Sequence, residues 1–228
     1  ENVVIRWVFK AARAQGIIDN IPDIPNEPRK RPEPDFIDHE RLPKFLVYLD
    51  SWHLELTDPK QVTPRFYREA LRDWCKVIIY CGCRTSEASL LKWKDWNPIV
   101  EDGIPIAEIA IRAEEAKGRK TGDRKAKGLA QLNDVLEKRR AKVEFNGDND
   151  YIFCHPNTAN KRWTGTYIKS FKKGFSQAIK GSGLFTEKEV DTFSPYILRH
   201  TFATLAVQRG GANIALLADV MGNSVKVI

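Results

Sequence analysis

Hydrophobic positions at helical spacing predict several amphipathic helices. The clearest spans residues 63–82, where apolar side chains recur three and four positions apart along one helical face. Thr63 is the expected N-cap of this helix, Pro64 its expected first residue, and Gly82 its expected end. The same spacing predicts further helices over residues 38–52, over 85–93 with Thr85 as cap, and over 166–180, 197–208 and 214–221.

A second pattern, alternation with a period of two, predicts strands between these helices. Residues 104–112 alternate in this way, and Gly118 and Gly122 permit a turn before a return strand toward Leu129. Residues 151–154 are expected to form a third strand, and residues 181–195 a loop. The predicted fold class is α+β, mainly α, with a small three-stranded antiparallel sheet.

Proline density predicts a boundary near the start of the chain. Five prolines fall between Pro22 and Pro34, which prevents regular helix and stiffens the chain. We therefore divide the chain into a helical fragment of a preceding domain (1–21), a proline-rich basic linker (22–35) and a main domain (36–228). The triplet Arg29-Lys30-Arg31 can either solvate the linker or cross a DNA backbone.

Charge and cysteine usage limit the classes of function that fit this sequence. The 228 residues carry a net charge of +7, which favours a polyanionic partner but also fits an ordinary basic protein. The distribution says more, because six of the eleven residues 117–127 are Lys or Arg. No apolar segment approaches the roughly 20 residues that span a membrane. The four cysteines lack zinc-finger spacing and are expected to be reduced thiols of a cytoplasmic protein.

Two arginines far apart in the sequence are the candidate functional residues. Arg84 precedes a predicted helix, where free N–H groups favour an anion. Arg199 lies in the first turn of the helix predicted over residues 197–208, about 100° around the axis from the apolar stripe of that helix. Arginine keeps its charge and binds two phosphate oxygens at once. Alone, each is more often structural, and Glu87 is a candidate partner for Arg84, but together they predict one pocket for a phosphodiester.

Three motifs carry a resemblance to a known family. Arg84-Thr-Ser-Glu87, Tyr196-Ile-Leu-Arg199-His200-Thr-Phe-Ala-Thr204 and Met221-Gly-Asn-Ser224 resemble the catalytic domain of the tyrosine recombinase (phage integrase) family. The family usually has histidine where Tyr196 and Asn223 stand here. The resemblance covers about residues 36–228 and implies that family's fold. It also makes residues 1–21 similar to the last helix of the family's core-binding domain.

The resemblance also implies site residues. Arg84, Arg199, Tyr196 and Asn223 take catalytic positions, supported by Glu87 and His200. A lysine of the predicted hairpin would be the general acid; we prefer Lys117, with Lys120 as the alternative. A phenol with a pKa of about 10 is a weak base at neutral pH, so Tyr196 would donate a hydrogen bond rather than accept a proton. The residues expected to contact DNA are Arg119, Lys120, Arg124, Lys125 and Lys127.

The activity implied by the resemblance is site-specific cutting and rejoining of double-stranded DNA through a 3′-phosphotyrosine link. It needs no metal, cofactor or small-molecule substrate, because the covalent link conserves the free energy of the broken bond. Family members act as homotetramers on DNA, here in the cytoplasm of a bacterial, archaeal or phage-infected host cell. The nucleophilic tyrosine is expected beyond Ile228, so residues 1–228 alone should be inactive. Two alternatives stay open: a DNA-binding module that no longer cuts, and a type IB topoisomerase.

Overall fold

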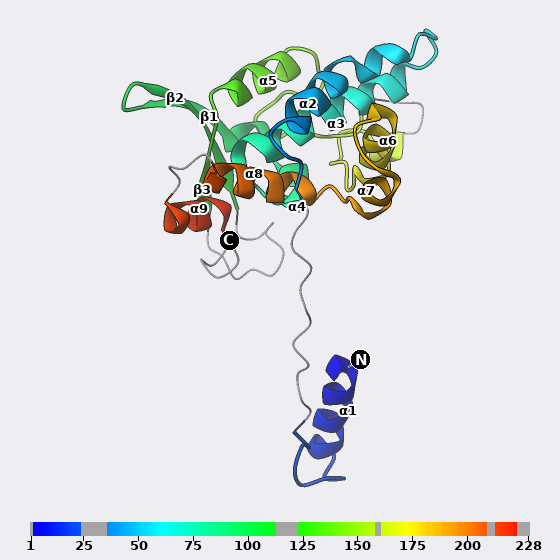
Figure 1. Ribbon diagram of the computed structural model, residues 1–228, viewed down its shortest axis with the longest axis vertical. Helices are drawn as coiled ribbons and strands as arrows, with labels where there is room; N and C mark the ends of the chain where they lie inside the picture. The colour runs from blue at the N-terminus through cyan, green and yellow to red at the C-terminus, as the bar shows by residue number, and fades with distance from the viewer. Residues whose placement is uncertain (1, 24–35, 113–122, 158–160, 209–212, 223–228) are drawn as a thin grey trace. The chain divides into compact units, whose positions relative to one another are not determined.

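The computed structural model describes residues 2–23, 36–112, 123–157, 161–208 and 213–222. The chain divides into two compact units, Glu1–Pro34 and Asp35–Ile228. The first contains α1 (Asn2–Ala14), which stops before Gly16, a glycine in the left-handed region with a φ of 69°. The second holds all the other described elements (Figure 1). None of the described helices is both long and apolar enough to cross a membrane.

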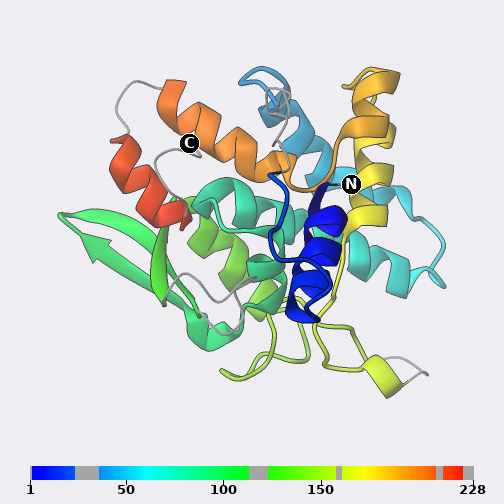
Figure 2. The ribbon, with the colours of Figure 1, turned by 90° about the horizontal axis from the view of Figure 1, so that it is seen from below.

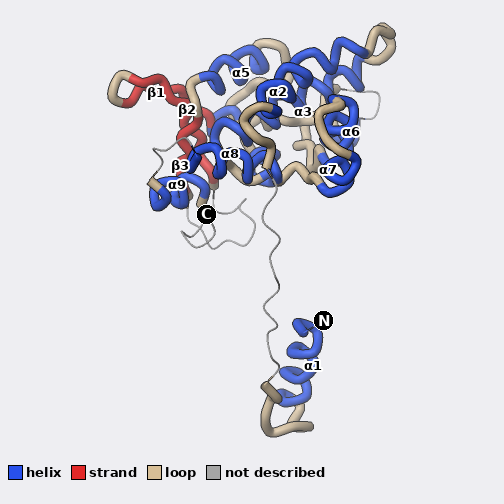
Figure 3. Tube along the Cα trace, in the orientation of Figure 1, coloured by secondary structure: helices blue, strands red, loops and turns tan. Residues whose placement is uncertain are grey.

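The centre of the larger unit is α3 (Val62–Cys81), whose buried face includes Leu71, Trp74 and Ile78. The helices that pack around it include α2 (Arg41–Trp52), α5 (Gln131–Arg140), α6 (Lys172–Ser182) and α8 (Ile197–Gln208), as Figures 1 and 3 show. The N-cap of α3 is Gln61, two residues before the predicted cap Thr63, and the Gln61 carbonyl accepts from the Arg65 amide at 3.0 Å.

The sheet has three antiparallel strands, as predicted, but one of the three is not the strand that was predicted; the order is β1-β2-β3. The strands are β1 (Trp96–Glu101), β2 (Ile104–Ile111) and β3 (Arg124–Gly128). The sequence pattern missed β1, which contains Pro98. Proline is tolerated there because β1 is an edge strand. Figure 3 shows the sheet at one side of a mainly helical unit.

The predicted third strand at residues 151–154 is wrong. Tyr151 and Cys154 form isolated bridges to Lys92 and Tyr167, outside the sheet. The same pairing explains a second error. The helix expected over residues 166–180 is α6 and begins only at Lys172, because the Ile168 amide donates to the Phe153 carbonyl at 2.8 Å. A backbone engaged in such a bridge cannot enter the helix.

Shorter elements complete the unit. The helix expected over residues 85–93 is α4 (Thr85–Leu90), followed by the 3-10 turn η2 (Trp93–Asp95). Neither α5 nor α7 (Glu187–Thr192) was predicted, and α7 lies in the segment expected to be a loop. The predicted bounds of α8 and of α9 (Ile214–Met221) are confirmed. Within the described ranges, the remaining 3-10 turns are η1 (His53–Glu55) and η4 (Lys161–Trp163).

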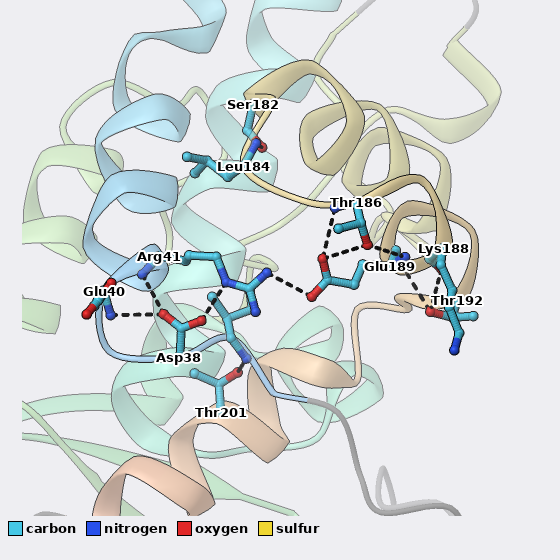
Figure 4. A network of polar contacts seen from close by, with 11 residues as sticks. Asp38, Glu40, Arg41, Ser182, Leu184, Thr186, Lys188, Glu189, Thr192 and Thr201 are labelled. Carbon is cyan, nitrogen blue, oxygen red and sulfur yellow. Dashed lines mark hydrogen bonds and ion pairs between the residues drawn. The ribbon is translucent and has the colours of Figure 1, made fainter.

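A polar network anchors the first turns of α8 to the start of this unit (Figure 4). The hydroxyl of Thr201, fully buried in α8, accepts a hydrogen bond from the Ile37 amide at 2.9 Å. Nearby, the Arg41 guanidinium joins Asp38 at 2.5 Å to Glu189 at 2.8 Å, linking α2 to α7. The Thr201 bond holds α8 at a point two residues after Arg199, so a tertiary contact helps to set the orientation of its first turn.

Gly82 brings α3 and α8 together. It follows the last turn of α3 with a φ of 66°, a conformation that glycine adopts without strain. A Cβ at this position would collide with the ring of Phe202 in α8. The glycine therefore permits a close approach, which places the turn before Arg84 against the helix that carries Arg199.

Candidate functional site

Arg84 is the N-cap of α4, one residue before the predicted cap Thr85, which is instead the first helical residue. Its extended backbone (φ −72°, ψ 152°) directs its amide at Glu87 Oε2, at 2.7 Å. The side chain turns back to the same carboxylate, with Nη1 2.7 Å from Oε1. Arg84 Nη2 donates to the Gly222 carbonyl at 2.6 Å, at the end of α9. One end of its guanidinium is thus fixed and the other faces α9.

Arg199 reaches the same place from α8. It is 1% exposed, and its Nη1 and Nη2 donate at 2.6 Å each to the carbonyls of Gly82 and Met221. Burial lowers the pKa of Arg199, and the charge of Arg84 lowers it further, while Tyr196 acts in the opposite direction. The ordinary pKa of arginine is so far above neutral that the group stays charged at neutral pH.

The two arginines therefore converge on consecutive carbonyl oxygens. Arg199 donates to Met221 and Arg84 to Gly222. Because neighbouring Cα atoms lie about 3.8 Å apart, the two guanidinium groups are within roughly 10 Å of each other. Carbonyls at a helix C-terminus carry partial negative charge, which favours cations at this point. The structure thus places both candidate phosphate ligands in a single cluster.

Arg124 completes this cluster, and the sequence reasoning did not foresee that. It was expected to contact DNA, but its side chain is only 11% exposed and turns inward from β3. Its Nη1 and Nη2 donate to the two oxygens of Glu87 at 3.1 and 2.7 Å. Burial on its own raises the pKa of Glu87, but the bonds from Arg124 and Arg84 outweigh it and hold that pKa below its ordinary value. Glu87 is thus a buried carboxylate shared by two arginines.

The signal that could have found Arg124 is the alternation of β3. Arg124, Ala126 and Gly128 lie on its inner face, whereas Lys125 and Lys127 lie on the outer one. On that outer face the lysines pair with the other two strands, Lys125 with Glu108 of β2 at 2.9 Å and Lys127 with Glu101 of β1 at 2.6 Å. Both lysines remain largely exposed, so the predicted DNA contacts of β3 divide into one inward and two outward side chains.

Tyr196 lies at the edge of the arginine cluster. It is 38% exposed and packs edge-on against His200, with ring centroids 4.8 Å apart. Tyr196 also lines a hollow of about 240 Å³ together with Thr85 and Ser86 of α4. Burial lowers the pKa of His200, and the neighbouring charge of Arg199 adds to the effect. The imidazole is therefore neutral at neutral pH, where it can either donate or accept a hydrogen bond.

Lys117, Arg119, Lys120 and Asn223 lie outside the described residues. The choice between the two candidate general acids, and the position of Asn223, therefore stay predictions.

Comparison with known proteins decides the family. The sequence model of the phage integrase family matches residues 37–225. The chain belongs to the phage integrase family. The resemblance inferred from the Arg84, Arg199 and Met221 motifs is thereby confirmed.

Individual members of the phage integrase family show how far the similarity reaches. The chain is 27% identical over 191 residues to the tyrosine recombinase XerH of Helicobacter pylori, covering 84% of this chain and 46% of XerH. A crystal structure of the XerH site-specific recombinase superposes with a TM-score of 0.60 at 25% identity, covering 86% of this chain and 50% of that one. The chain thus spans about half the length of XerH.

A solved structure with lower sequence identity supports the fold alone. A structure of the Tn1549 transposon integrase superposes with a TM-score of 0.61 at 16% identity, covering 96% of this chain and 68% of that one. Together these structures confirm the predicted fold class, a mainly helical catalytic domain with a small antiparallel sheet.

Proposed function

We propose that this chain is the catalytic part of a site-specific recombinase that cuts and rejoins double-stranded DNA through a 3′-phosphotyrosine link. The observation that carries the proposal is the convergence of Arg84 and Arg199 on consecutive carbonyl oxygens. A carbonyl oxygen and a non-bridging phosphate oxygen are both acceptors that a guanidinium recognises. The XerH structure, described as bound to its difH substrate in a pre-cleavage complex, supports DNA as the substrate.

In this proposal the two arginines stabilise the charge that develops on the phosphate during cleavage. Because Arg199 is 1% exposed and its Nη2 donates to the Met221 carbonyl, a phosphate oxygen must replace that carbonyl as the acceptor of Arg199 Nη2. Tyr196, exposed at the edge, donates a hydrogen bond to a phosphate oxygen.

The remaining roles fall on residues outside the described ranges. Lys117, or alternatively Lys120, protonates the leaving 5′-oxygen, and Asn223 donates to the phosphate through its amide. The nucleophile is a tyrosine encoded beyond Ile228 in the complete gene. The assembly on DNA is a homotetramer, and the chemistry uses no cofactor, because the phosphotyrosine link keeps the free energy of the broken bond.

The proposal is tested by covalent adduct formation between the full-length protein and labelled duplex DNA. Arg84→Gln should reduce the rate of adduct formation about 10²- to 10³-fold, the loss typical of a group that stabilises transition-state charge. The affinity for DNA should fall only slightly, because many backbone contacts share it. Lys44→Gln is the matched control, since it removes one positive charge from an exposed position of α2. Equal losses of affinity and of adduct formation would contradict the proposed role of Arg84.

The rival function is a DNA-binding module without cleavage activity, and the replacement of the family's usual histidine by Tyr196 favours it. Changing the tyrosine encoded beyond Ile228 to phenylalanine separates the two functions. A recombinase should then bind DNA without forming an adduct. If the wild-type full-length protein binds DNA and never forms one, the binding module is the correct function. Relaxation of plasmids that lack a specific site would identify a topoisomerase instead.

A further inference from the structure

We propose that Arg124 is a positioning residue of the recombination site, which holds the end of α9 and the Arg84–Glu87 pair in place without touching DNA itself. The inference rests on the proposed function and gives Arg124 a role different from that of the two exposed lysines beside it. The residue belongs to β3, whereas the groups that it contacts belong to α4 and α9.

The first contact of Arg124 is with the carboxylate that orients Arg84. Arg124 donates to both oxygens of Glu87, and those oxygens accept from the amide and the Nη1 of Arg84. The Glu87 side chain is 1% exposed, so water cannot replace a lost partner easily. The direction in which the Arg84 guanidinium points is therefore coupled to Arg124 through a buried carboxylate.

The second contact is with the C-terminal end of α9, which packs beside β3 (Figure 2). Arg124 Nε and Nη2 lie 3.3 Å from the carbonyls of Val220 and Met221. Gly222 follows with a φ of 62°, and a Cβ built there would lie 2.8 Å from Arg124 Nε and 2.9 Å from Cζ. The guanidinium thus occupies the space that glycine leaves open, and the end of α9 is seated on it.

These contacts close a ring around the site. Arg124 holds Glu87, Glu87 holds Arg84, Arg84 donates to the Gly222 carbonyl, and Gly222 packs against Arg124. Arg199 joins the ring at Met221. Because the reacting groups must be held to a fraction of an ångström, a shift of about 1 Å in this ring can slow the reaction about 10²-fold.

The chemistry of arginine makes this role distinguishable from a DNA contact. A planar guanidinium can donate to a carboxylate and to carbonyls at the same time, whereas an ammonium group is a compact point charge that cannot reproduce this geometry. A lysine at this position would still attract a phosphate backbone. Arg124→Lys should therefore preserve the charge and lose the positioning.

The test uses the full-length protein with Arg124→Lys, Arg124→Gln and, for comparison, Lys125→Gln on the outer face of the same strand. We expect both Arg124 variants to lower the single-turnover rate of adduct formation at saturating DNA about 10²-fold. Their affinity for DNA should stay within about threefold of wild type, since no phosphate contact is lost. Lys125→Gln should instead lower the affinity for DNA and make that affinity less dependent on salt concentration. Rates are compared at a temperature where circular dichroism shows every variant fully folded.

A second arm follows the end of α9 directly. The Gly222 amide donates to carbonyls of the last turn of α9, so its hydrogen exchange reports whether that end is fixed. Exchange in the peptide covering α9 should accelerate in both Arg124 variants and in Gly222→Ala, but not in Lys125→Gln. Gly222→Ala disturbs the same contact from its other side, so combining it with Arg124→Gln should add little further loss.

The outcomes separate this inference from the proposed function. Two results would overturn the positioning role. One is that Arg124→Lys forms the adduct as fast as the wild-type protein does. The other is that the Arg124 variants lose as much affinity for DNA as they lose rate of adduct formation. If the wild-type protein forms no adduct at all, the proposed function fails. The exchange arm then still decides, because unchanged exchange in the Arg124 variants would show that Arg124 does not fix α9.

Discussion

Glu87→Gln is the change that tests the arginine cluster most directly. The Glu87 carboxylate accepts four hydrogen bonds, two from Arg84 at 2.7 Å and two from Arg124 at 2.7 and 3.1 Å. Glutamine keeps the shape but removes the negative charge, and it turns an NH₂ group toward a guanidinium. Two partly buried cations would then face each other without a counter-charge.

The expected magnitude follows from the burial of the three side chains. Removing one partner of a buried ion pair costs about 3–5 kcal/mol of unfolding free energy. The Arg84 and Arg124 side chains are 22% and 11% exposed, so water relieves part of the loss. We therefore take the lower end, about 3 kcal/mol, which corresponds to a decrease in Tm of roughly 6–12 °C for a domain of this size.

Chemical denaturation followed by circular dichroism measures the difference, with Glu101→Gln as control. Glu101 pairs with Lys127 at 2.6 Å, but the two side chains are 43% and 47% exposed. Such a pair contributes less than about 1 kcal/mol. Similar losses for Glu87→Gln and Glu101→Gln would refute the reasoning, because burial would then not determine the strength of the pair.

The pH dependence gives an independent check. The pKa of Glu87 in the folded protein lies below its ordinary value. The ionised carboxylate therefore stabilises the fold above the ordinary pKa, and this stabilisation is lost as the pH falls through the folded pKa. The difference in unfolding free energy between wild type and Glu87→Gln should stay constant from about pH 7 to about pH 5. It should become smaller below about pH 4.3. A difference that does not change with pH would show that the charge is not the cause.

Three further outcomes are expected. Gly82→Ala should lower the unfolding free energy by at least about 2 kcal/mol in a denaturation experiment, because it combines a positive φ with a collision against Phe202. Arg139→Met should cost about 3 kcal/mol in the same assay, because Arg139 is 4% exposed and pairs with Asp73 at 3.3 Å. In the full-length protein, Tyr196→His should accelerate adduct formation above about pH 6.5, where a neutral imidazole can accept a proton. An unchanged pH–rate profile would contradict that role for position 196.

The sequence by itself determined the elements whose pattern is long and local. The apolar stripes that predict α3, α8 and α9 are confirmed, because each helix buries one face and its hydrogen bonds stay within the segment. The motifs around Arg84 and Arg199 were sufficient to predict the family. Residue type is enough for that prediction, because only a charged, forked side chain recognises a phosphate in this way.

The tertiary structure decided what depends on partners distant in the sequence. Residues 151–154 look like a sheet strand, but their backbone hydrogen bonds join them to Leu91 and Ile168, and β1 takes the place in the sheet. Arg124 looks like one more basic residue of a hairpin. The inward direction of its side chain depends on the register of β3 with β2 and on the buried carboxylate of Glu87 in α4. Alternation shows which residues share a face of a strand, but only the packing of α3 and α9 against β3 determines which face is buried.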